Sequence, residues 1–151
     1  MTGRPGARAG YPAAMSEADL NVEIVREMLL ASGDGDPLAA LPTFDPACEW
    51  DMSGVAAWPE KDVYRGLDEI RTFLEGWAGS WEEWRFEVLE VCPAGDGQVY
   101  AAIHEWGVGA GSGAGVDQHR YSVLRLRGGL VVRLQMFSDR SDALRTAGLR
   151  E

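Results

Sequence analysis

The chain has 151 residues, of which 46% are hydrophobic and 25% charged, a composition typical of one folded globular domain and far from a disordered one. The 24 acidic and 14 basic side chains give a formal net charge of −10, which disfavours nucleic acid and anionic membranes as partners. No segment approaches the roughly 20 apolar residues of a membrane span. Two cysteines are too few for a disulfide framework, so we expect a cytoplasmic protein.

Residues 1–15 are rich in Gly, Pro, Ala and Arg and offer almost nothing to bury, which predicts a disordered leader before a domain at 16–151. The leader lacks the apolar core of a signal peptide. Met15 is an alternative start of translation, because a helix start follows it directly.

Three helices are predicted next. Ser16 and Asp19 resemble a capping box before a helix that ends near Gly33. Pro37 favours the first turn of a short helix that runs to about residue 44. A third helix is indicated by apolar residues at helical spacing: Leu67, Ile70, Leu74 and Trp77.

From residue 84 the period changes to two, and strands are predicted near 84–91, 99–108, 119–127 and 130–138, after a short one at 48–52. A change of phase after Val88 indicates a bulge, and the glycines at 109–115 indicate a flexible hairpin connection. Asp139 can cap a short C-terminal helix. The predicted class is α+β, with the helices on one face of a strongly curved antiparallel sheet.

The segment 64–73 (YRGLDEIRTF) and the closing run 129–149 resemble the SnoaL-like branch of the nuclear-transport-factor-2-like superfamily, which includes ketosteroid isomerases, polyketide cyclases and limonene-epoxide hydrolases. The resemblance covers about residues 17–150. It implies a cone of curved sheet plugged by helices, an apolar pocket inside the cone, and a homodimer formed through the outer sheet face. It does not imply one reaction, because the same cone hosts several.

Strand alternation and the family pattern together select the residues expected to face the pocket. His104 is expected inside as a general acid or base, Arg120 as a stabiliser of anionic oxygen, and Asp51 as a partner for either. The substrate is expected to be a small apolar molecule. Its expected binding residues are Trp50, Trp58, Tyr64, Trp106, Ser122, Leu124, Leu134 and Met136.

Structural roles compete with these functional ones. His104 is equally well explained as a core histidine with a satisfied ring, and Arg120 as a residue that points to solvent. Tryptophans are more often core residues than ligand walls. Which of Trp50 and Asp51 points inside is left open, and His119 is expected on the outer face. The two histidines and two cysteines show no metal-ligand spacing, so no metal is expected.

The resemblance also limits the chemistry. Ser122 stands where isomerase and cyclase relatives carry a catalytic aspartate, so the catalytic carboxylates of both are incomplete here. Of the catalytic residues of the epoxide hydrolases, only Arg120 is present. Three classes of function remain: a cofactor-free isomerase, cyclase or hydrolase that uses His104, a non-catalytic module that binds a small molecule or a partner, and a structural dimer with a closed, dry core.

Overall fold

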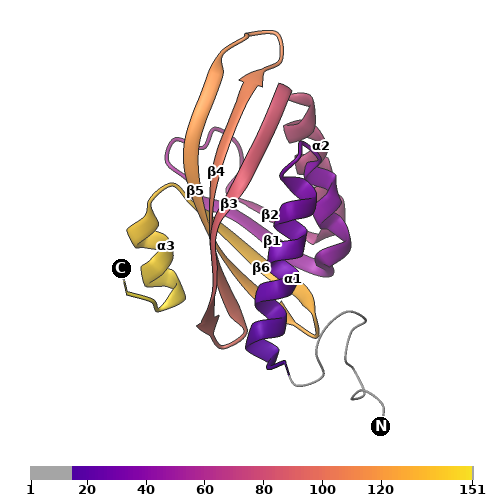
Figure 1. Ribbon diagram of the computed structural model, residues 1–151. Coiled ribbons are helices and arrows are strands. Elements are labelled where there is room, and N and C mark those ends of the chain that lie inside the picture. The colour runs from indigo at the N-terminus through magenta and orange to yellow at the C-terminus, as the bar shows by residue number, and fades with distance from the viewer. Residues whose placement is uncertain (1–14, 151) are drawn as a thin grey trace.

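The computed structural model describes residues 15–150, so the leader predicted for residues 1–15 lies, apart from Met15, outside the described residues. Helices come first along the chain, and strands form most of its second half (Figure 1). The elements are α1 (Glu17–Ser32), η1 (Pro37–Thr43), β1 (Phe44–Gly54), β2 (Val63–Arg65), α2 (Gly66–Gly79), β3 (Trp81–Gly95), β4 (Gln98–Gly109), β5 (Gly115–Arg127), β6 (Leu130–Phe137) and α3 (Arg140–Ala147).

The six strands form one curved sheet in the order β2-β1-β6-β5-β4-β3. The predicted all-antiparallel sheet was wrong in one pairing, because β1 and β6 run parallel. The chain leaves β1 through β2 and α2, enters the opposite edge at β3, and returns strand by strand until β6 lies beside β1. The first long strand and the last one therefore lie side by side inside the sheet, next to the short edge strand β2.

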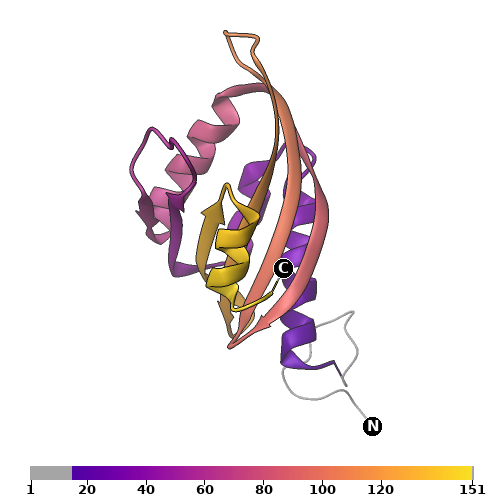
Figure 2. The ribbon, with the colours of Figure 1, turned by 90° about the vertical axis from the view of Figure 1, so that its left-hand side faces the viewer.

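Helices lie on both faces of the sheet, and this corrects the prediction that all of them lie on one face. Helices α1, η1 and α2 pack on the concave face, which we call the inner face, and bury the larger core there. Helix α3 packs on the other, outer face against Tyr100, Ala102, Val123 and Phe137. Figure 2 shows α1 and α3 on opposite sides of the strands.

Several local predictions are confirmed. Ser16 caps α1, because its hydroxyl accepts the Asp19 N–H at 3.1 Å. The register of β3 against β4 shifts between Val88 and Glu90, where the predicted bulge lies. The second helix begins at Pro37 as expected, but it is a 3₁₀ helix. Pro42 lies inside it, and its missing N–H suits a short irregular helix better than an α-helix.

Candidate functional site

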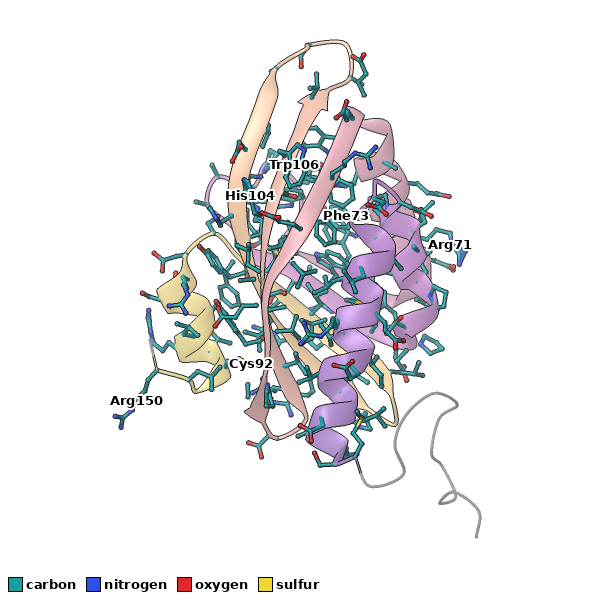
Figure 3. All side chains as sticks on the ribbon, in the orientation of Figure 1. Arg71, Phe73, Cys92, His104, Trp106 and Arg150 are labelled. Carbon is teal, nitrogen blue, oxygen red and sulfur yellow. The ribbon has the colours of Figure 1, made fainter. Side chains whose placement is uncertain are left out.

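A cavity of about 100 Å³ lies between the inner sheet face and helices α1 and α2. Helix α2 contributes Phe73, Leu74 and Trp77 to its wall, and α1 contributes Met28 and Leu29. In Figure 3, Phe73 lies on the α2 side of the sheet, among the side chains that fill the space between helices and strands. The strands line the cavity with Phe44, Trp50, Met52, Trp84, Phe86, Ile103, Glu105, Arg120, Ser122, Leu124, Leu134 and Met136.

A buried carboxylate and a guanidinium interrupt this apolar lining. Glu105 on β4 is 4% exposed, and its Oε2 lies 3.5 Å from Arg120 Nε on β5. Trp84 Nε1 donates to Glu105 Oε1 at 3.1 Å, and Gln118 Nε2 donates to Oε2 at 2.6 Å. A buried charge is tolerated only when it is paired and hydrogen-bonded, and here the two neighbouring strands, β3 and β5, supply the partners.

Arg120 and Ser122 share the inner face of β5. Arg120 Nη1 donates to the Ser138 hydroxyl at 3.1 Å, which fixes the guanidinium from the side away from Glu105. Ser122 is 7% exposed, and no hydrogen bond to its hydroxyl exists within residues 15–150. The Ser122 hydroxyl lies two residues from the Arg120 guanidinium, and both side chains are in the cavity wall. Together they can bind one oxygen atom of a ligand.

His104 and Trp106 do not face this cavity, so the predicted inward facing of both was wrong. Residues that oppose each other in neighbouring strands share a face of the sheet, and His104 opposes His119, whereas Arg120 opposes Ile103. His104 and Arg120 are therefore on different faces. Figure 3 shows His104 toward the side of the sheet on which α3 packs.

The error has a physical cause in β4. Helix α3 covers Tyr100 and Ala102 on the outer face, so both faces of this strand are apolar at its start. Alternation of apolar and polar residues therefore does not distinguish the faces there. The signal that could have found Glu105 is that it shares its phase with Val99, Ala101 and Ile103.

On the outer face, His104 lies between two carboxylates. Its Nε2 is 2.7 Å from Asp117 Oδ1, and its Nδ1 is 3.3 Å from Glu87 Oε1. The ring stacks on His119 at 5.0 Å between centroids. The hydrogen bond with Asp117 and then the one with Glu87 raise the pKa of His104 above its ordinary value of 6.5. The ring is satisfied by carboxylates, as the structural alternative predicted, but His104 lies on the outer face and not in the core.

The remaining predicted residues divide between the cavity and its surroundings. Trp50 points inside, and Asp51 points outside, where its Oδ2 lies 3.3 Å from Arg133 Nη2. Trp58 and Tyr64 pack on Phe73 from outside the cavity, with ring centroids at 5.8 and 4.3 Å. The structure places four further predicted residues in the wall: Ser122, Leu124, Leu134 and Met136.

Within residues 15–150, no group of three or more His, Cys, Asp or Glu side chains is arranged to hold a metal ion. None of the described helices combines the length and the hydrophobicity that a membrane span requires.

Solved structures share this fold at low sequence identity. An NTF2-like protein of unknown function from Burkholderia pseudomallei is 20% identical, with a TM-score of 0.68, over 87% of this chain and 97% of that one. A protein of Jannaschia described as SnoaL-like polyketide cyclase is also 20% identical, with a TM-score of 0.65, over 85% and 90%. TerC, co-crystallised with polyporic acid, is 15% identical, with a TM-score of 0.66, over 85% and 98%.

No curated protein matches the chain in sequence. The model of the SnoaL-like domain family matches residues 25–134, which reach from α1 to the Leu134 of the cavity wall. The curved sheet, the helices on its inner face and this match agree with the predicted resemblance, and the chain belongs to the SnoaL-like domain family.

Proposed function

We propose that the chain is a cofactor-free enzyme that moves a proton on a small, flat, largely apolar metabolite, as isomerases and cyclases do. The observation that supports this function is the group of Glu105, Arg120 and Ser122 in the wall of an otherwise apolar cavity. Glu105 takes the role of acid and base that the sequence assigned to His104.

The reaction uses the three side chains in two parts. The Glu105 carboxylate removes a proton from the carbon beside a carbonyl group, and the electron pair moves onto the carbonyl oxygen. Arg120 and the Ser122 hydroxyl stabilise the resulting enolate oxygen, which is where such a site lowers the barrier most. Protonated Glu105 then returns the proton to another carbon, which gives an isomer. In a cyclisation the enolate carbon instead attacks a second carbonyl carbon of the same molecule, and Glu105 gives its proton to the alkoxide oxygen that this attack forms.

Aromatic rings fit the body of such a substrate. Trp50, Phe73 and Trp84 line the cavity, and the rings of Trp50 and Phe73 meet edge to face at 5.5 Å. Flat apolar molecules bind well against faces and edges of this kind. The similarity to a protein described as a SnoaL-like polyketide cyclase and to TerC with polyporic acid also favours a ring-containing substrate.

Deuterium exchange tests this function without knowledge of the natural substrate. The protein is incubated with 2-tetralone, a flat bicyclic ketone, in D₂O, and exchange beside the carbonyl is followed by NMR. We expect exchange above the buffer rate and a loss of about 100-fold in Glu105→Gln, as is usual for removal of a general base. Glu87→Gln makes the same change on the outer face and should leave the exchange rate unchanged.

Circular dichroism checks that the Glu105→Gln variant is folded before its activity is interpreted. Ser122→Ala, which removes one hydroxyl from the cavity wall, should lower exchange by about tenfold through a weaker contact to the oxygen. Full exchange activity in a folded Glu105→Gln protein would contradict the role of Glu105.

A binding module without catalysis is the second candidate. It is favoured by the hydrogen bonds of Glu105, because Trp84 and Gln118 already donate to its two oxygens. A ligand that raises the melting temperature while 2-tetralone shows no exchange above buffer would select this function.

Two broader expectations stay proposals. We propose a homodimer through the outer sheet face, as the family resemblance implies, on the part of that face that α3 leaves uncovered. We also propose a cytoplasmic location, which the two free cysteines favour.

A further inference from the structure

The inner cavity is small for a substrate with two rings. Its volume is about 100 Å³, whereas pockets for small molecules span about 300–1,000 Å³. A cavity of about 150 Å³ in another protein holds a single benzene ring. A flat molecule of two rings therefore fits only when part of the cavity wall moves aside.

Two side chains of α2 separate the cavity from a second concave region. This region, which we call the α2 groove, follows one face of the helix on the outside of the cavity and has a volume of about 480 Å³. Within residues 15–150, Phe73 and Trp77 line both spaces, and no other residue does so. A movement of either ring would therefore join the cavity to the groove.

Phe73 is the more firmly held of these two residues. Its ring stacks on that of Tyr64 with 4.3 Å between centroids, and Tyr64 is 5% exposed. The ring nearest to the half-buried Trp77 is that of Trp81, at 5.3 Å and an angle of 58° between the planes. The looser packing makes Trp77 the side chain that can move.

Hydrogen bonds distinguish Trp77 from the other tryptophans of the cavity wall. Trp50 Nε1 donates to Met52 Sδ at 3.0 Å, and Trp84 Nε1 donates to Glu105 Oε1 at 3.1 Å. In the described part of the chain, the Trp77 indole N–H has no such partner. Its ring can leave the wall without breaking a hydrogen bond.

The α2 groove offers space for the displaced ring. Gly76 precedes Trp77 and lines the groove, and a Cβ atom built on it would meet no atom within 4 Å. A side chain at this position would occupy the space beside the indole. The glycine therefore leaves room for the Trp77 ring to turn outward.

We propose that Trp77 is a plug that fills part of the substrate site in the free protein and turns into the α2 groove beside Gly76 when the substrate binds. One ring of a two-ring substrate then takes the place of the indole, against Trp84, whose ring centroid lies 6.1 Å from that of Trp77. Because Trp84 donates to Glu105, this position is next to the proposed base. The proposal rests on the proposed function in taking the cavity as the substrate site.

The test measures the affinity for 2-tetralone by NMR titration, and it requires no turnover. The Trp77→Ala variant should bind about tenfold more tightly than the parent, because no ring has to be displaced before binding. In the parent, the Trp77 indole N–H signal, assigned by its absence from the spectrum of Trp77→Ala, should move toward the position of an exposed indole as the ligand binds.

Two glycines of α2 supply a matched pair of variants. A Cβ atom at Gly76 or at Gly79 meets no atom within 4 Å, but only Gly76 lines the groove. Leucine favours a helix more than glycine does, so both variants should fold. Gly76→Leu should weaken binding about tenfold, because the leucine takes the space of the displaced ring, and Gly79→Leu should leave it unchanged.

A double variant shows whether the leucine obstructs the indole or the ligand itself. Trp77→Ala/Gly76→Leu should bind as tightly as Trp77→Ala, because no ring is left to displace. Equal affinities in the parent, Trp77→Ala and Gly76→Leu would overturn the proposal, and so would a lack of binding by Trp77→Ala. The expected affinities without deuterium exchange would reject the catalytic function but support the plug, whereas exchange with equal affinities would do the reverse.

Discussion

His104 and Glu105 are neighbours in β4, yet they lie in opposite environments. The Glu105 side chain is 6% exposed and meets an arginine, an indole and an amide. The His104 side chain is 26% exposed, and the carboxylates beside it are 58% and 74% exposed. Water can replace the outer partners but not the inner ones. The same strand therefore carries a buried ion pair, in which removal of one partner is costly, and an exposed cluster whose charge changes with pH.

The largest expected effect comes from breaking the inner pair. Glu105→Gln keeps the shape of the side chain but leaves the Arg120 guanidinium without a counter-charge. We expect the free energy of unfolding in urea to fall by about 3 kcal/mol, as is typical when one partner of a buried pair is removed. The double variant Glu105→Leu/Arg120→Met should recover most of this loss. A Glu105→Gln protein as stable as the parent would mean that water reaches Arg120.

The outer cluster predicts a smaller effect that depends on pH. Because the pKa of His104 is raised in the folded state, its stabilisation is complete below pH 6.5 and is lost as the pH rises through the folded-state value. Urea unfolding from pH 5 to 9 should show this decline. Asp117→Asn removes the main cause of the shift and should flatten the decline more than Glu87→Gln does. Identical pH profiles in the three proteins would contradict the assignment.

The smallest expected effect needs no substitution: it is the difference in reactivity between the two cysteine thiols. Cys48 is fully buried in the inner core, and Cys92 packs at the edge of the outer one. Burial raises the pKa of both thiols, that of Cys48 to about 12. Iodoacetamide at pH 8 should modify Cys92 first and Cys48 only after unfolding, as mass spectrometry would show. Rapid modification of Cys48 in the folded protein would reveal that the inner core opens.

The elements themselves were predictable from local patterns. Apolar spacing located α2, alternation located β3 to β6, and the glycine pair at 128–129 located the last hairpin. On β5 the alternation also placed Arg120, Ser122 and Leu124 on the inner face. These predictions succeeded because each depends on residues only a few positions apart.

The candidate site was harder because it depends on pairing between strands. Glu105 meets Gln118 and Arg120 only through the register of β4 and β5, and it meets Trp84 only through that of β3 and β4. Nothing within β4 shows that α3, which begins 31 residues after the end of that strand, covers its outer face. The sequence-based prediction therefore named His104, whereas the titratable side chain that lines the cavity is that of the next residue, Glu105.

The parallel pairing of β1 with β6 has a consequence for how the protein is made. Phe44 lies opposite Val131, and Gly54 lies opposite Phe137, so this pairing joins residues more than eighty positions apart in sequence. Such distant pairing is slow to form. On the ribosome, β1 must wait with one edge unpaired until almost the whole chain has been synthesised, and a protein cut short before residue 130 would leave that edge open to other chains.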